Sequence, residues 1–140
     1  MQDRPTAIEL LTAASEFVER ELVPIAEGAR QFQTRVVANV LKIVAREIEM
    51  GETFMRSEVD ALAALLKEQK PHLHTTSDVR AAAVKMNEML SERIRTGEID
   101  HDPARADVMK VVRQVVEDKL RIANPRYLED DLRLRSRSKA

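Results

Sequence analysis

Apolar residues recur every three or four positions along most of the chain, which is the spacing of amphipathic α-helices. No segment shows the regular alternation of a half-buried β-strand. Glycine occurs three times and proline five times, and these residues separate the apolar repeats. The pattern predicts about five helices, which begin at Thr6 and then cover about 29–50, 57–69, 77–97 and 103–124. We therefore expect an all-α fold, a single-domain helix bundle over residues 1–128.

Short motifs predict where several of these helices begin and end. Thr6–Glu9 and Ser57–Asp60 each have the spacing of a capping box, in which two side chains bond the free N–H groups of a first turn. Gly51 suits the left-handed residue that ends a helix, and Pro24 is expected to close or kink the first helix. Asp102–Pro103 predicts the last start, with Asp102 as the N-cap and Pro103 in the first helical position.

Three ionisable side chains fall on apolar helix faces. At about 100° per residue, Glu47 lies inside a wide apolar arc of the second helix, Lys119 lies among the valines of the fifth, and Arg93 lies beside the methionines of the fourth. Because a buried charge needs a partner, we expect Glu47 to pair with Lys119 or Arg93, unless the long cationic side chains reach solvent. Glu47→Ala should then destabilise the protein far more than Glu49→Ala.

The same inward charges allow a second interpretation. An interhelical cavity could be lined by Arg35, Asn39, Glu47 and Lys119, and it would bind a small polar ligand. A filled core with Glu47 paired would favour the architectural interpretation. An open cavity lined by these side chains would favour ligand binding.

The segment after the fifth helix combines unusual residues. Asn124 precedes Pro125, which pushes its backbone away from helix and leaves its amide able to cap the last carbonyls. Arg126 and Tyr127 follow, and they offer several donors and an amphipathic ring. This segment either folds back to fix the end of the bundle or forms a docking edge for a partner or an anion.

Composition limits the possible binding partners and the cellular location of the protein. Lys and Arg total 23 against 24 Asp and Glu, so the chain has no strong overall field for nucleic acid or an anionic membrane. There is no cysteine, no signal-peptide pattern and no apolar run of about 20 residues, and a cytoplasmic location follows as the expectation.

Residues 129–140 are charged and have little to bury, so a flexible tail is expected. Its basic part, Arg133–Lys139, lacks aromatic residues and argues against a nucleic-acid arm.

The sequence lacks a recognisable catalytic or cofactor motif. His72, His74 and His101 fall in predicted loops, and nothing in the pattern brings them together as metal ligands. No serine sits in a nucleophile elbow, and the three glycines are too far apart for a phosphate-binding loop. We therefore expect no catalytic residue, no metal and no cofactor.

Several segments resemble one known family. They are 4–11, 27–32, 35–39 (Arg-Val-Val-Ala-Asn), 43–47 and 119–128, the last of which contains Ala-Asn-Pro-Arg-Tyr. Together they resemble a small bacterial family of unknown function, whose genes lie beside aminoglycoside-phosphotransferase-like kinases and acyl-CoA dehydrogenases. The resemblance implies a role near acyl-CoA or carboxylic-acid catabolism, and it supplies no catalytic residue.

Two hypotheses follow from the sequence. The first is a non-enzymatic helical accessory protein, which binds the neighbouring kinase, the dehydrogenase or a second copy of itself. The second is a small-ligand-binding bundle or weak enzyme around Glu47 and Lys119.

Overall fold

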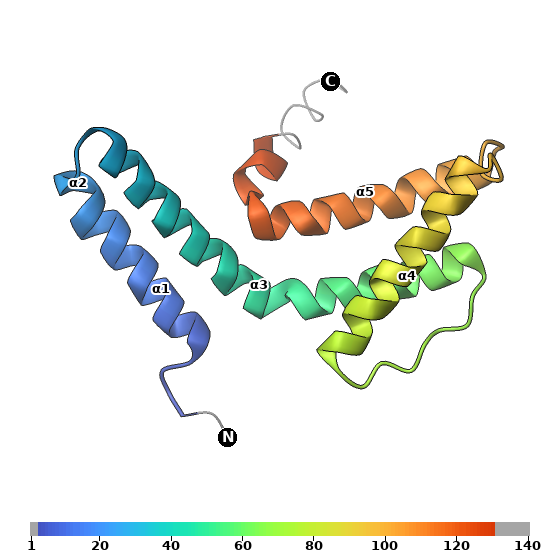
Figure 1. The fold of residues 1–140 in the computed structure, drawn as a ribbon, viewed down its shortest axis with the longest axis horizontal. Coiled ribbons are helices and arrows are strands. Elements are labelled where there is room, and N and C mark those ends of the chain that lie inside the picture. Colours follow the sequence, from blue (N-terminus) through green and yellow to red (C-terminus); the bar gives the residue numbers. More distant parts are fainter. Residues whose placement is uncertain (1–2, 131–140) are drawn as a thin grey trace. The chain divides into compact units, whose positions relative to one another are not determined.

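The computed structural model describes residues 3–130, and within them every regular element is helical (Figure 1). The all-α prediction is therefore confirmed. The elements are α1 (Ala7–Phe17), a π-helical turn η1 (Val18–Leu22), α2 (Val23–Ile25), α3 (Gly28–Leu66), α4 (Thr76–Arg95) and α5 (Ala104–Ala123).

The chain divides into two compact units, with the boundary inside α3. Unit 1 extends to Gly51, and unit 2 begins at Glu52. Each unit is described by itself below. The single domain expected over residues 1–128 stays a prediction.

The long helix α3 replaces two predicted helices and the break between them. Gly51 is helical, so its predicted role as a left-handed helix end is wrong, and so is the predicted start at Ser57. The glycines with positive φ are Gly28 and Gly97. A single glycine costs a helix only about 1 kcal/mol relative to alanine, and no proline lies between Gly51 and Leu66 to force an end. The helix therefore continues to Leu66, and Lys67 leaves it at a φ of 57°.

The other helix starts follow local capping chemistry. The capping box of Thr6–Glu9 is confirmed: the Glu9 N–H donates to the Thr6 hydroxyl at 3.2 Å, and the Thr6 N–H donates to the Glu9 carboxylate at 2.7 Å. A second box at Thr75–Asp78 starts α4, slightly earlier than the start predicted near Ser77. The predicted N-cap Asp102 is wrong, because α5 begins one residue later and Pro103 occupies the cap without a side-chain hydrogen bond.

The π-helical turn η1 explains how the first helix passes Pro24. A proline lacks the N–H of a helical hydrogen bond, and its ring collides with the carbonyl four residues earlier. The wider π-turn directly before α2 relieves this clash. The helix therefore continues to Ile25 before the chain turns into α3.

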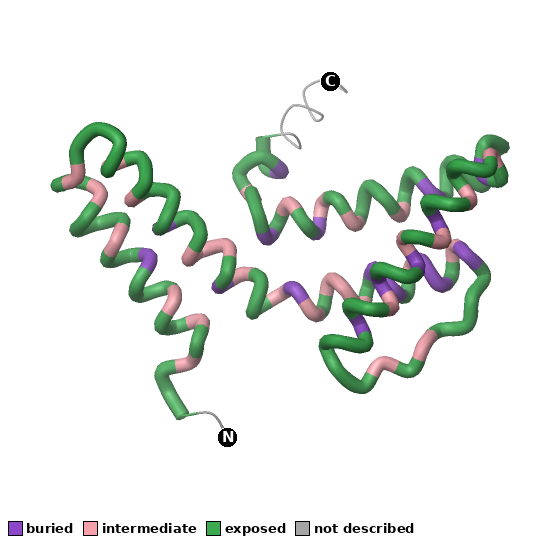
Figure 2. Tube along the Cα trace, viewed as in Figure 1, coloured by how far each residue is buried: buried purple, intermediate pink, exposed green. Residues whose placement is uncertain are grey.

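Unit 1 is a helical hairpin whose two arms meet through small side chains. Its buried residues are Ser15, Ala38, Ala45 and Gly51. On one side the Lys42 ammonium lies 2.5 Å from the Glu19 carboxylate, and this ion pair joins the arms. Small residues allow close approach of the helices, but they bury little apolar area. The larger apolar residues of the hairpin are half-buried or exposed, and most of its trace is coloured accordingly (Figure 2).

Unit 2 contains the hydrophobic core. Leu62 on α3, Val79 on α4 and Val108 on α5 are buried there. Ile99, in the loop between α4 and α5, is buried in the same core. The positions on α3 and α4 recur at helical spacing, so each of these two helices buries one stripe, and α5 contributes Val108. The remaining members of the core cluster are Val59, Ala63, Leu66, Ala83, Met86 and Leu90.

The apolar residues of α5 are only partly buried. Val108 faces the core, whereas Met109, Val112 and Val116 are exposed, because the buried side of α5 is rotated toward Asp118 and Ile122. After the break at Asn124, residues 125–130 are helical again, so the first two residues of the predicted tail are ordered as helix. The rest of that tail, including Arg133–Lys139, lies outside the described residues.

Candidate functional site

A buried carboxylate at Glu58 is the centre of a polar group in unit 2. Glu58 is 8% exposed and lies on the part of α3 that faces α4 and α5. The Asn87 side-chain amide donates a 2.8 Å hydrogen bond to Glu58 Oε1 and a 2.9 Å bond to the Ala83 carbonyl. The Lys119 ammonium lies 3.8 Å from the same Glu58 oxygen. One side chain from each helix therefore meets at this carboxylate.

Lys119 thus has an acidic partner, but this partner is not Glu47. Glu47 is exposed on α3 of unit 1, so its expected inward position is wrong. Its carboxylate folds along its own helix, 3.0 Å from where a Cβ at Gly51 would stand. The absence of a side chain at Gly51 leaves room for this carboxylate.

The other members of the predicted site are distributed over both units. Arg35 and Asn39 are exposed on α3 in unit 1, like Glu47. Arg93 and Lys119 lie in unit 2 and pair with other carboxylates there. Neither unit by itself assembles the predicted cavity around Glu47 and Lys119.

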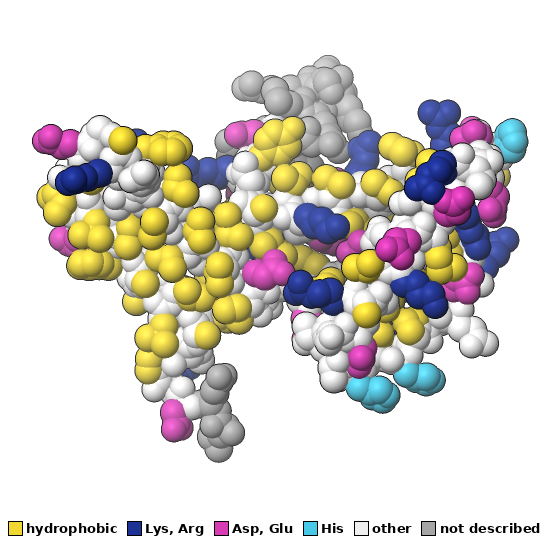
Figure 3. Space-filling view, in the orientation of Figure 1, with side chains coloured by type: hydrophobic (Ala, Val, Ile, Leu, Met, Phe, Trp, Pro, Cys, Tyr) yellow, Lys and Arg dark blue, Asp and Glu magenta, His cyan; other side chains and the backbone are white. Residues whose placement is uncertain are grey.

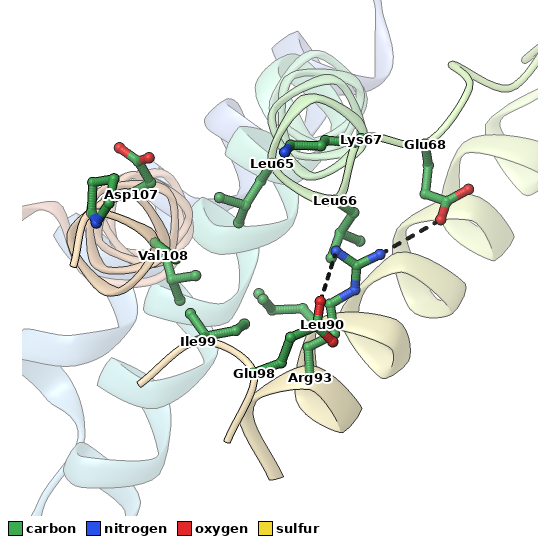
Figure 4. A pocket seen from close by; sticks show the side chains of 12 residues that line it. Leu65, Leu66, Lys67, Glu68, Leu90, Arg93, Glu98, Ile99, Asp107 and Val108 are labelled. Carbon is green, nitrogen blue, oxygen red and sulfur yellow. Dashed lines mark ion pairs between the residues drawn. The ribbon is translucent and has the colours of Figure 1, made fainter. Parts of the chain in front are cut away.

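Arg93 lies at the opening of a cavity of about 570 Å³ in unit 2 (Figure 4). Its guanidinium is 3.8 Å from the Glu68 carboxylate and 3.7 Å from that of Glu98. Both distances exceed ordinary hydrogen-bond lengths, so the arginine is held electrostatically between two carboxylates. The apolar side chains that line the cavity are Leu65, Leu66, Leu90, Ile99, Pro103, Ala104 and Val108.

The charge balance of the cavity restricts what could bind there. Lys67 and Arg93 are its cations, and Glu68, Glu98 and Asp107 are its carboxylates. Three negative groups against two positive ones disfavour a carboxylate or phosphate ligand. The size is suitable for a small molecule, and the charges fit a neutral or cationic one.

A second buried carboxylate belongs to α5 alone. Asp118 is 8% exposed. It accepts a hydrogen bond from the Gln114 amide at 3.0 Å and pairs with Arg121 one turn later. Because all three residues lie on one helix at spacings of three and four, this group stabilises α5 locally.

The join between α3 and α4 carries a perturbed carboxylate. The Thr76 hydroxyl donates a 2.6 Å hydrogen bond to Glu52, and Arg56 donates two more from one turn along α3. These bonds favour the charged form, so they hold the pKa of Glu52 below its ordinary value. The arrangement fixes the start of α4 against α3.

Asn124 caps the short helical segment that follows it. Its side-chain oxygen accepts a 3.3 Å hydrogen bond from the Tyr127 N–H, so the amide serves the next helix start and not the last carbonyls of α5. Pro125 then takes the first helical position, where its missing N–H costs nothing. Arg126 and Tyr127 are exposed.

Glu58 is the functional-site candidate that sequence reasoning missed. It lies four residues before Leu62 and seven before Leu65, and this spacing places it on the same side of the helix. The signal was therefore present in the sequence. It was overlooked because the predicted helix began at Ser57, which placed Glu58 in an exposed first turn.

Residues 3–130 contain neither a metal-binding cluster nor a membrane-spanning helix. The three histidines are exposed, and no cluster of three or more potential ligand residues is arranged to hold a metal ion within that range. None of its helices combines the length and apolar character that a membrane crossing requires.

Comparison with known proteins places the chain in a family. Residues 24–127 match the model of a domain of unknown function, DUF6285. This match covers most of the chain, including α3, α4 and α5, so the protein belongs to that family. The comparisons found no matching curated protein and no matching solved structure.

Proposed function

We propose that the protein is a non-enzymatic accessory protein that binds a partner protein through α5. The observation that carries this proposal is an exposed apolar row, Met109, Val112 and Val116, which we name the α5 row. Its members are spaced by three and four residues and lie on one side of the helix. The core of unit 2 is packed without these three side chains, so they remain available for contact with another protein.

The segment after α5 exposes residue types that are common in protein interfaces. Tyr127 is 59% exposed, and Arg126 beside it is also exposed. Methionine, tyrosine and arginine are enriched where proteins meet, because they combine apolar contact with directed hydrogen bonds. The predicted docking edge at 124–127 and the α5 row therefore belong to one helix and its continuation.

The family resemblance suggests the partner. A phosphotransferase-like kinase or an acyl-CoA dehydrogenase is encoded beside such genes, and either enzyme would place the protein in the cytoplasm near carboxylic-acid catabolism. The accessory role requires contact with the enzyme and no catalytic residue of its own.

Binding of the purified full chain to each purified candidate enzyme tests this function. Val112→Glu and Val116→Glu should weaken binding at least tenfold. A charge placed in an apolar contact makes the binding free energy less favourable by about 1.4 kcal/mol or more. Val84→Glu is the matched control, because Val84 is an exposed valine on α4. Equal affinity for all three variants, or no binding by the unmodified chain, would exclude this role.

A second function, small-ligand binding, is favoured by the cavity beside Arg93. A neutral or cationic ligand with a short apolar part suits its charges and lining. Butylamine and butyrate, compared in thermal unfolding, provide a direct test. Stabilisation by the amine alone, abolished by Glu98→Gln at an exposed carboxylate of the cavity, supports the site, whereas no shift with either compound counts against it.

A further inference from the structure

One side of the unit 1 hairpin is apolar on both arms. Leu10 and Phe17 on α1 and Val37, Val44 and Ile48 on α3 are all exposed, and we name these five residues the unit 1 face. Figure 3 shows hydrophobic side chains gathered over α1 and the first half of α3. Further exposed apolar residues of the same hairpin are Leu22, Ile25, Phe32, Val36 and Val40.

The hairpin cannot bury these side chains by itself. Its buried apolar residues are Ala38 and Ala45, whereas the core cluster of unit 2 buries large side chains such as Leu62, Met86 and Leu90. At these sizes and exposures the five side chains of the unit 1 face present roughly 450 Å², which is about the apolar share of the ~800 Å² that each partner buries in a standard protein interface. The hairpin therefore has enough apolar surface for a stable contact.

We propose that a second copy of this chain covers the unit 1 face, so that two hairpins form an antiparallel four-helix bundle. A hairpin with one apolar side is half of such a bundle, and a two-fold axis supplies the identical half. The proposal concerns a different surface from the α5 row and does not rest on the function proposed above.

The charges of the two arms favour a second copy as the occupant. The N-terminal arm, residues 7–25, is acidic, and residues 28–51 of α3 are basic. The arm carries Glu9, Glu16, Glu19 and Glu21 against Arg20, and the α3 portion carries Arg30, Arg35, Lys42 and Arg46 against Glu47 and Glu49. Six of these charges line one hollow of the hairpin itself, where Glu19 pairs with Lys42. The remaining charges are −2 on the arm and +1 on α3, so the two arms of different copies are complementary in sign.

The same charges select between two arrangements. With a two-fold axis perpendicular to the helices, α1 would lie on α1 of the second copy and α3 on α3, so like charges would meet. With the axis parallel to the helices, α1 lies on α3 of the second copy, and opposite charges meet at both contacts. The second arrangement is the one proposed.

The register follows from contacts inside one hairpin. Glu19 pairs with Lys42, so positions whose numbers add to about 61 lie at one height along the hairpin. Phe17 is therefore level with Val44. A two-fold axis parallel to the helices preserves height, so it brings Phe17 of one copy opposite Val44 of the second copy.

Sedimentation velocity of the full chain, from micromolar to hundreds of micromolar concentration, tests the association. The unmodified protein and the control Val84→Glu should have the mass of two chains. Phe17→Glu and Val44→Glu should have half that mass while they keep the helical circular dichroism of the unmodified chain. A monomer at every concentration, or a dimer that both face variants leave intact, would overturn the proposal.

Disulfide formation tests the arrangement without a disruptive charge, because the chain has no cysteine of its own. Phe17→Cys and Val44→Cys are prepared separately, mixed and oxidised. Covalent dimers that join the two different variants should form at least tenfold faster than dimers of either variant alone. Faster joining of Phe17→Cys to itself, or no joining of the mixture, would contradict the register.

The two proposals can fail separately. A dimer that binds neither candidate enzyme removes the proposed accessory role and leaves the hairpin contact in place. A monomer whose binding to an enzyme depends on Val112 and Val116 removes the hairpin contact and leaves the accessory role.

Discussion

The ammonium of Lys119 lies 3.8 Å from Oε1 of Glu58, and the two groups are very unequally buried. The Lys119 side chain is 70% exposed, whereas that of Glu58 is 8% exposed. Most of the cost of desolvation therefore falls on the carboxylate. Asn87, which donates to this carboxylate at 2.8 Å, is its nearer polar partner.

Asn87→Ala should be more destabilising than Lys119→Ala. Removing the amide leaves a buried carboxylate without its short hydrogen bond, at a cost of about 1–3 kcal/mol. Removing the exposed lysine should cost less than about 1 kcal/mol, because solvent already screens that charge. Urea unfolding of both variants measures the two differences. A larger loss for Lys119→Ala would mean that the ion pair, and not the amide, holds Glu58.

Glu47→Ala and Glu49→Ala should have nearly the same effect on stability. Both side chains are exposed on α3, so neither leaves an unpaired buried group behind. This expectation reverses the one drawn from the apolar arc of the sequence. Thermal unfolding midpoints of the two variants decide between them, and a distinctly lower midpoint for Glu47→Ala would restore an internal role for Glu47.

Local chemistry was the most predictable part of the fold. Thr6–Glu9 was identified correctly because a capping box is complete within four residues. Gly51 was misread, because a glycine inside a helix and a glycine at its end look alike in the sequence. Helix ends depend on small free energies that packing overrides, and the continuous α3 is one result.

The candidate site was less predictable, because it depends on which helix face is buried. Periodicity identified Lys119 as an unusual charge, but its partner could come from any helix. A wide apolar arc was interpreted as buried around Glu47, although an arc can also remain exposed. Only the arrangement of α3, α4 and α5 assigns Glu58 as the acidic partner.

Gly51→Ala should stabilise the protein by up to about 1 kcal/mol, because alanine is the better helix former. The new Cβ would stand 3.0 Å from Glu47 Oε1, at the free end of an exposed side chain that can move aside. Gly97→Ala is the matched control and should destabilise the protein, because Gly97 has a φ of +76°. Denaturant midpoints test both variants. A loss of stability in Gly51→Ala would show that the Glu47 side chain cannot move away from the new Cβ.

The carboxylate of Asp78 should make stability depend on pH in the acid range. Hydrogen bonds from the Thr75 backbone and hydroxyl hold the pKa of Asp78 below its ordinary value of 3.8. The folded state therefore favours the charged form. Its contribution is complete above the ordinary pKa and is lost as the pH falls through the lower, folded-state pKa.

Replacing Asp78 with asparagine isolates this contribution. The thermal midpoint of the unmodified protein should exceed that of Asp78→Asn by a constant amount from neutral pH down to about 4, and the difference should shrink below that. Asp102→Asn is the control, because α5 begins without a side-chain cap and Asp102 is exposed. Its difference from the unmodified protein should be small throughout. If the Asp78→Asn difference stays unchanged at the lowest pH at which the protein folds, the carboxylate charge contributes nothing to the start of α4.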